Sequence, residues 1–371
     1  MRIDGTKKTK RVLGLAAAFA VILGACGGGD DAAEAPTVTD AEEVELTSSD
    51  GGILAAVQER GVLRCGVSGA AVAFSFTAAD GSMNGIDADY CRAVAAAVLG
   101  DATAVEFVSL TAAERFTAVQ TGSIDVLMRN STWTQSRDTD VGMDFGPTTY
   151  FDGQQLMARA ADGFTTSSQV SDVDGAVVCT NAGTTTETNI SELASVLGIK
   201  ITLTTFEDYD QVTEAFIAGT CDVITTDGSG LVGRKSVQEP SKDAWVIFPA
   251  TPFSKEPLGP VYPQNDSQWA DVVNWTVYAT FIADEYGVGS DEVSAAAAGD
   301  FGPEMVRLMG GEGELQSVMG LSATAFADVI TQVGNYQQIW DRNLTPVGLV
   351  REGSANALWN KGGLLYAPPA R

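Results

Sequence analysis

Histidine is absent from the 371 residues of the chain. This absence excludes Ser-His and Cys-His nucleophile pairs, zinc sites built on imidazole, and the usual general base near neutral pH. An enzyme with this composition would have to work with carboxylates, lysine or tyrosine. The composition therefore favours a binding protein over a catalyst, and we expect neither a metal nor a cofactor.

Long hydrophobic runs are missing as well. The apolar run at 12–25 is shorter than the about 20 residues that a membrane-spanning helix needs, and no later run reaches that length. The run follows a cluster of lysines and arginines and ends in Leu-Gly-Ala before Cys26. This order is typical of a lipoprotein signal peptide at 1–25, with lipid on Cys26. We therefore expect an extracytoplasmic protein anchored to the membrane through Cys26. The alternative is a plain secretory signal in which the cysteine is incidental.

Positive charge is scarce, because 22 lysines and arginines stand against 48 aspartates and glutamates, which gives a formal net charge of -26. So acidic a surface repels nucleic-acid backbones and anionic lipid headgroups. Nucleic acid is excluded as a partner. The acidic stretch at 26–50, which opens with three glycines, cannot bury a core and predicts a flexible tether.

Cysteine is also rare, with five in the chain. If Cys26 carries the lipid, then four remain in an oxidising compartment, where disulfides are expected, and they allow three pairings. Pairing Cys65 with Cys91 and Cys179 with Cys221 keeps each bridge within one half of the chain, whereas a bridge between the halves would oppose hinge motion. Four buried free thiols are the alternative.

What the chain does contain is a repeated alternation of strands and helices. A length of 371 residues suits two hydrophobic cores, since single cores stop growing at roughly 250 residues. The first half predicts strands at 62–67, 105–110 and 124–128 with helices at 85–99 and from 111 to 122, and the second half predicts strands at 176–179, 201–205 and 221–225 with helices at 187–197 and 210–218. This order indicates parallel βαβ units in two α/β lobes. From about residue 258 the pattern becomes helical, notably at 269–286 and 325–340.

The two halves also correspond in sequence. Segment 116–130 superposes without gaps on 213–227, with four identities at an offset of 97 residues. The offset makes Asn130 and Asp227 equivalent strand ends. Ligands of open α/β sheets bind beyond the carboxyl ends of the strands, so two facing lobes would bring both residues to one cleft.

Several blocks in the same order resemble the general L-amino-acid-binding proteins of polar amino-acid ABC importers, which are extracellular solute-binding proteins of family 3. The blocks are GVLRCGV (61–67), GIDADYCRAV (85–94), RNSTWT (129–134) with RDT (137–139), AGTTTE (182–187), TTDGSGL (225–231), SKEPLGP (254–260) and WNKGGLLYAPP (359–369). The resemblance implies an α/β, periplasmic-binding-protein-like fold of two Rossmann-like lobes joined by a two-strand hinge, with a helical C-terminal extension. It divides the chain into a first lobe at 51–150 and 258–371 and a second lobe at 151–257 that includes the hinge crossings.

The resemblance also implies a set of ligand-binding residues in the first lobe. Arg137 would grip the carboxylate of an amino acid with its planar guanidinium, which fits a carboxylate better than lysine does. Asn130 and Thr132 would add polar contacts, and Phe74 would wall the side-chain pocket. A surface arginine that neutralises neighbouring aspartates is the alternative for Arg137.

In the second lobe, Thr184 and Thr185 would meet the same carboxylate at a helix N-terminus, where free N–H groups favour an anion. Asp227 would receive the ammonium. Helix capping is the alternative for both the threonines and the aspartate. Only a closed form, with both lobes on the ligand, would satisfy both of its charges.

The expected protein is thus a monomer that captures L-amino acids with broad specificity and delivers them to the permease subunits of an ABC importer. The main alternative is a prephenate or arogenate dehydratase-like enzyme on the same fold, for which Glu114 is the nearest candidate acid. A ligand-sensing ectodomain of a signalling protein is a third possibility.

Overall fold

The computed structural model describes residues 52–139, 142–238, 244–310 and 315–371, all within one compact unit of the chain. The predicted signal peptide at 1–25, Cys26 and the tether at 26–50 lie outside the described residues. Over the described ranges, no helix combines the length and the apolar character needed to cross a membrane.

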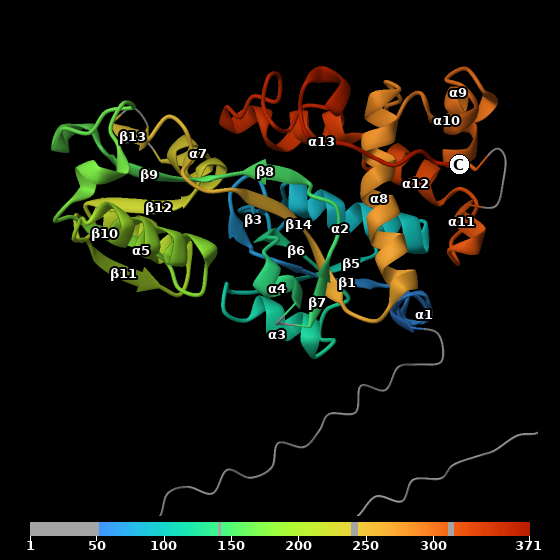
Figure 1. The fold of residues 1–371 in the computed structure, drawn as a ribbon. Coiled ribbons are helices and arrows are strands. Elements are labelled where there is room, and N and C mark those ends of the chain that lie inside the picture. The colour runs from blue at the N-terminus through green and yellow to red at the C-terminus, as the bar shows by residue number, and fades with distance from the viewer. Residues whose placement is uncertain (1–51, 140–141, 239–243, 311–314) are drawn as a thin grey trace, which may run out of the picture. The chain divides into compact units, whose positions relative to one another are not determined.

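The first lobe is built on a sheet in the order β5-β1-β6-β14-β7, to which β8 is added by pairing with β14 (Figure 1). Its strands are β1 (Leu63–Val67), β5 (Val105–Ser109), β6 (Val126–Thr132), β7 (Met143–Phe145), β8 (Tyr150–Asp152) and β14 (Glu256–Pro263). Strand β1 runs parallel to β5 and β6, whereas β14 is antiparallel to its neighbours. A small sheet adds β2 (Ala70–Ala71), β3 (Ser75–Thr77) and β4 (Met83–Asn84), and the helices are α1 (Gly52–Arg60), α2 (Ile86–Leu99), α3 (Arg115–Gln120) and α4 (Gln135–Thr139).

The second lobe repeats this plan in the order β11-β10-β12-β9-β13. Its strands are β9 (Gln154–Arg159), β10 (Val177–Asn181), β11 (Thr202–Phe206), β12 (Val223–Asp227) and β13 (Trp245–Phe248), and its helices are α5 (Thr185–Leu197), α6 (Tyr209–Ile217), α7 (Gly228–Val237), η1 (Ala160–Asp162) and η2 (Val170–Val173). Strand β10 is parallel to β11 and β12, as β1 is to β5 and β6. The strands β6 and β12 therefore hold equivalent places in the two sheets.

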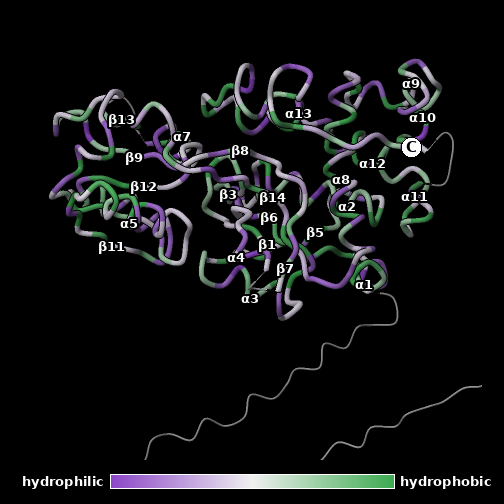
Figure 2. The backbone as a smooth tube through the Cα atoms, in the orientation of Figure 1, coloured by the Kyte–Doolittle hydropathy of each residue, from purple (hydrophilic) through white to green (hydrophobic). Residues whose placement is uncertain are grey.

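Alternation along the strands builds a core on each face of the second sheet. Leu156 and Ala158 of β9 join one apolar cluster beside α5, whereas Met157 between them joins the other cluster beside α6. Successive side chains of a strand point to opposite faces, so a sheet covered by helices on both sides has apolar residues at consecutive positions. Figure 2 shows such hydrophobic stretches within both sheets.

The helices after β14 pack onto the first lobe. They are α8 (Ser267–Glu285), α9 (Val293–Ala298), α10 (Pro303–Leu308), α11 (Leu315–Val318), α12 (Ala325–Gln332) and α13 (Tyr336–Asn343), followed by η4 (Thr345–Val347) and η5 (Trp359–Lys361). Trp269 and Trp340 from these helices are fully buried in one core with Tyr90 of α2. The predicted fold class, two α/β lobes with a helical C-terminal extension, is confirmed.

The chain passes between the lobes beside the antiparallel pair of β8 and β14, in which Asp152 lies opposite Glu256. The C-terminal extension braces this pair, because the side-chain amide of Asn356 accepts from the N–H of Phe151 at 2.7 Å and donates to its carbonyl at 3.0 Å. Strands β9 to β13 fall within 151–257, and the residue limits of the lobes stay a prediction.

Two disulfides strengthen the lobes separately. Cys65 of β1 pairs with Cys91 of α2, and Cys179 of β10 pairs with Cys221, which precedes β12. Each bridge therefore joins a central strand to a neighbouring segment of the same lobe and leaves the hinge free of covalent constraint.

Candidate functional site

A pocket of about 230 Å³ opens where the carboxyl ends of the parallel strands of both lobes meet. From the first lobe it is lined by Ser68, Ala70, Ala71, Val72, Phe74, Ser109, Leu110, Thr111, Ala112, Glu114, Arg115, Arg129, Asn130 and Thr132, and from the second by Asn181, Thr184, Thr185, Thr186, Asp208, Tyr209, Thr226, Asp227, Ser229, Gly230 and Arg234. Six of the seven predicted ligand-binding residues are among them. The seventh, Arg137, is not.

Phe74 is fixed by a tight approach of two backbone segments. Gly85, with φ +125°, precedes α2, and a Cβ there would lie 2.1 Å from the carbonyl oxygen of Phe74. This approach lets the N–H of Asp87 donate to the same carbonyl at 2.9 Å. The ring of Phe74 is 2% exposed and meets Tyr150 edge-on at 5.3 Å, so it forms a rigid apolar wall.

Asn130 lies on β6 with φ +31°, an uncommon value for a residue other than glycine. Its backbone N–H donates to the carboxylate of Asp87 at 2.8 Å, which holds the strand in this conformation. Within the described part of the chain, the buried side-chain oxygen of Asn130 has no hydrogen-bond partner. A buried acceptor of this kind is costly unless something donates to it, so a ligand with an N–H group would remove the penalty.

At the N-terminus of α5, Thr184 and Thr185 differ in their contacts. Thr184 is the N-cap: its hydroxyl accepts from the N–H of Glu187 at 3.1 Å and donates to the carbonyl of Asn181 at 2.8 Å. The capping alternative therefore describes the hydroxyl of Thr184. The hydroxyl of Thr185 instead points toward the hinge and donates to the carboxylate of Glu256 at 2.9 Å.

Asp227 ends β12 and precedes α7, yet its side chain makes no capping hydrogen bond. The carboxylate is 6% exposed. Burial raises its pKa well above the usual value, and the charges of Asp152 and Glu256 raise it further, whereas Arg115 and Arg137 act in the opposite direction. A buried carboxylate of this kind favours a cationic ligand, because a positive charge beside it would offset its desolvation.

Arg137 lies on α4, and it is 9% exposed. Its guanidinium donates to the carbonyl of Thr132 at 2.9 Å and lies over the ring of Phe116, 5.0 Å from the centroid. Burial lowers its pKa, and Glu256 and Asp227 oppose this shift. Arg137 is therefore next to a lining residue without reaching the pocket itself, and its predicted contact with a ligand stays a prediction.

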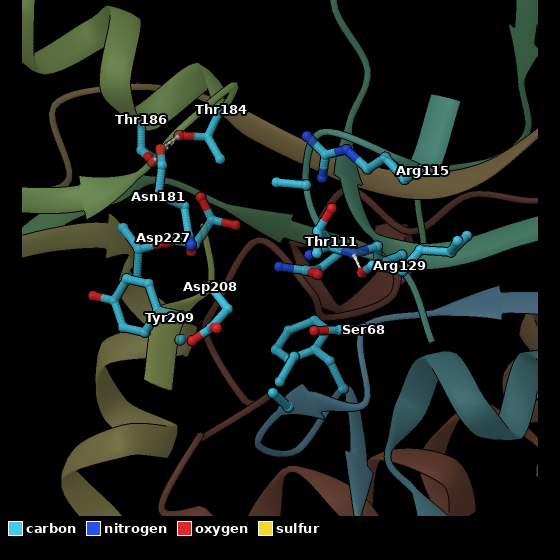
Figure 3. Close-up of a pocket in the computed structure, with 18 of the residues that line it drawn as sticks. Ser68, Thr111, Arg115, Arg129, Asn181, Thr184, Thr186, Asp208, Tyr209 and Asp227 are labelled. Carbon is cyan, nitrogen blue, oxygen red and sulfur yellow. Dashed lines mark hydrogen bonds between the residues drawn. The ribbon is translucent and has the colours of Figure 1, made fainter. Parts of the chain in front are cut away.

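Three arginines that the sequence did not single out line the pocket, Arg115 and Arg129 from the first lobe and Arg234 from the second. Figure 3 shows Arg115 and Arg129 on the side of the first lobe and Asp227 on the side of the second. Arg115 is 3% exposed, and its Nε has no hydrogen-bond partner among the described residues. Burial lowers its pKa well below the usual value, and the charges of Arg129 and Arg137 lower it further. With Glu114 beside the two arginines on the first lobe, and Asp208 and Arg234 beside Asp227 on the second, the lining is net cationic on the first side and net anionic on the second.

Burial likewise lowers the pKa of Arg129 to about 10, against the opposing charge of Asp87, and its Nε donates to the carbonyl of Leu110 at 2.8 Å. A signal for Arg129 was available, because it begins the block at 129–134. Arg115 gave no such signal, since it stands within a predicted helix next to Glu114.

Comparison with known proteins agrees with this geometry. Over residues 63–280 the chain matches the sequence model of the bacterial extracellular solute-binding proteins, family 3. It is 42% identical over 324 residues to the general L-amino acid-binding periplasmic protein AapJ of Rhizobium johnstonii, a match that covers 86% of this chain and 92% of the relative. It is 41% identical over 318 residues to the glutamate/glutamine/aspartate/asparagine-binding protein BztA of Rhodobacter capsulatus. This match covers 85% of this chain and 92% of the relative.

A solved structure is similar over the same extent. The periplasmic binding protein of an ABC transporter from Brucella ovis, with glutathione bound, is 40% identical and superposes with a TM-score of 0.81 over 86% of this chain and 99% of that one. Sequence, fold and the position of the pocket between two lobes all lead to the same assignment. The chain belongs to the bacterial extracellular solute-binding proteins, family 3.

Proposed function

We propose that this protein is the extracytoplasmic binding component of an ABC importer and captures L-amino acids between its two lobes. One observation carries the proposal: buried groups of opposite charge, Arg115 and Asp227, line the same pocket from different lobes. A free α-amino acid has an ammonium for Asp227 and at least one carboxylate for the cationic side of the first lobe. Arg234, the buried arginine that the second lobe adds to the lining, is already paired with Asp210 and with the carbonyl of Ala70. A ligand that meets both charges therefore contacts both lobes and stabilises the closed arrangement by its higher affinity for it.

The ammonium of the ligand would bind the carboxylate of Asp227, and the free side-chain oxygen of Asn130 is a second acceptor in the same pocket. The carboxylate would bind Thr132, Thr185 and the N–H groups at the start of α5. Arg137, whose guanidinium donates to the carbonyl of Thr132, would add a positive charge near the carboxylate of the ligand. The ring of Phe74 would pack against the side chain of the ligand.

Arg115 supports a preference within the amino acids. Among the residues that the structure describes, no carboxylate forms an ion pair with the buried guanidinium of Arg115, so an acidic ligand side chain would stabilise it most and an amide oxygen next. The name of the relative BztA, which binds glutamate, glutamine, aspartate and asparagine, fits this preference. We therefore expect acidic and amide side chains to bind more tightly than aliphatic ones.

The same proposal covers the membrane anchor of the protein and its partners. Lipid on Cys26 would hold the two lobes near the membrane, a monomer would meet the permease subunits of the importer, and no cofactor would take part. Replacing Cys26 by serine should release the protein from washed membranes, and persistence of the variant on membranes would contradict the anchor.

The dehydratase alternative finds no support. Glu114, its candidate acid, is exposed, and its carboxylate accepts from the backbone N–H of Thr111 at 3.0 Å and from the hydroxyl of that residue at 2.9 Å. These hydrogen bonds lower its pKa, which is the wrong direction for a group that has to donate a proton. The relatives with known names are transporter binding proteins.

A ligand screen tests the proposal. Purified protein, unfolded and refolded to remove any captured ligand, would be heated with each of the twenty L-amino acids, selected D-enantiomers, glutathione and prephenate. We expect the largest increases in melting temperature with L-glutamate, L-aspartate and their amides, because a ligand that binds only the folded state stabilises it. An unchanged melting temperature with every L-amino acid would refute the proposal, and turnover of prephenate would favour the enzyme.

A further inference from the structure

Glu256, at the start of β14, is a buried carboxylate to which both lobes donate hydrogen bonds. It is 1% exposed. One oxygen accepts from the hydroxyls of Thr132 at 2.6 Å and Thr185 at 2.9 Å. The other accepts from the side-chain amide of Asn189 and the hydroxyl of Ser254, both at 2.7 Å. All four contacts are within normal hydrogen-bond distance, so the carboxylate is fully engaged.

The two threonines come from different lobes. Thr132 ends β6 and Thr185 begins α5, and their hydroxyl oxygens are 3.4 Å apart. A hydroxyl has one proton to donate, and here both protons go to the same oxygen of Glu256. Neither hydroxyl can donate to a second carboxylate at the same time. Both residues nevertheless line the pocket.

Glu256 lies close to the place where the carboxylate of the ligand is proposed to bind. The charge of Glu256 opposes the fall in the pKa of Arg137, whose guanidinium donates to the carbonyl of Thr132. Glu256 thus lies among the residues to which the proposed function assigns the carboxylate of the ligand. Asp152 stands opposite it in the β8–β14 pair, and like charges at such a position repel.

We propose that Glu256 is an internal competitor of the ligand. In the unliganded protein its carboxylate takes the hydroxyl protons of Thr132 and Thr185, and an incoming amino acid has to exchange its own carboxylate for that of Glu256. Glu256 thereby weakens binding and keeps the ligand releasable when the lobes reopen at the permease. This inference rests on the proposed function, because it assumes a carboxylate ligand at these threonines.

The variant Glu256→Gln tests the competition. Glutamine keeps the shape and one acceptor oxygen but removes the negative charge that repels the carboxylate of the ligand. By calorimetry we expect the amino acid that gives the largest thermal shift to bind roughly tenfold more tightly, the effect of an interaction that moves a neighbouring pKa by one unit. The carboxamide of that amino acid, which lacks the α-carboxylate, should gain nothing. The matched control is Glu192→Gln, an exposed position on α5 with the same change of charge, and its affinity should equal that of the wild type.

A purely structural role predicts the reverse, since damage to the hinge would weaken binding of the acid and the carboxamide alike. Equal or weaker binding of the amino acid by folded Glu256→Gln would overturn the inference. If that variant does not fold, a crystal structure of the wild type with the amino acid bound decides, because both hydroxyls should then have left Glu256. Retention of both contacts would overturn the inference as well. Should the wild type bind no amino acid at all, the proposed function itself fails.

Discussion

Replacing Asp227 by asparagine separates ligand recognition from folding. The two side chains have nearly the same shape, and the carboxylate of Asp227 makes no capping hydrogen bond that the change would break. What is lost is the negative charge that the ammonium of the ligand would meet. Hydrogen bonds to charged groups contribute about 1.5–3 kcal/mol and neutral ones about 1 kcal/mol, so binding should weaken by about 0.5–2 kcal/mol. That difference corresponds to roughly a two- to thirtyfold increase in Kd.

The unliganded protein should respond in the opposite direction. Burial and the neighbouring carboxylates of Asp152 and Glu256 raise the pKa of Asp227, which means that the ionised form is disfavoured in the folded state. Asparagine removes this cost, so the melting temperature of the variant without ligand should equal or exceed that of the wild type. Calorimetric titration and thermal unfolding measure the two effects, with Asp271→Asn on the exposed side of α8 as the control. Unchanged affinity, or a large loss of stability in the absence of ligand, would refute the reasoning.

Three further predictions concern charge, pH and the disulfides. Arg115→Ala should weaken binding of L-glutamate far more than that of L-leucine in calorimetry, because only an acidic side chain needs the guanidinium; equal losses would contradict the proposed preference. Burial raises the pKa of Asp227 well above its usual value and raises that of the neighbouring Asp152 to about 6. Amino-acid affinity should therefore fall as the pH is lowered and Asp227 takes up a proton, whereas the contribution of these two groups to folding stability is largest at low pH and is lost as the pH rises through their raised values. A Kd that stays constant from about pH 8 to about pH 5 would exclude their titration. Replacing Cys179 and Cys221 by serine opens a loop of 42 residues and should lower the free energy of unfolding by about 4 kcal/mol in denaturant titrations, whereas a loss near zero would mean that the bridge constrains little.

The strand and helix order was predictable because each lobe is a layered α/β structure with strong apolar periodicity. Boundaries were less so. The capping pair of Thr111 and Glu114 forms its reciprocal hydrogen bonds, yet α3 begins only at Arg115, because the pair closes a turn ahead of the helix. The apolar stripe at 325–340 is divided into α12 and α13 by Gly334, with φ +99°, after which Asn335 caps the second helix.

The site was partly predictable because the two lobes repeat one strand and helix order. The 97-residue offset assigned Asn130 and Asp227 to equivalent strand ends, and both line the pocket. The position of Arg115 depends on how α3 packs against β6 and β14, which no local pattern encodes. Glu256 was equally hidden, because three of the four hydrogen bonds that make its buried carboxylate tolerable at the hinge come from segments far apart in the sequence, and only Ser254 is a near neighbour.

In the proposed complex, opposite charges from two lobes hold the two charges of one amino acid. Calorimetric titration of the wild-type protein with one L-amino acid, its N-acetyl derivative and its carboxamide removes each charge of the ligand in turn. We expect tight binding of the free amino acid and a loss of at least about tenfold with either derivative. Equal affinity for the amino acid and for either derivative would mean that the protein does not hold the charge which that derivative lacks.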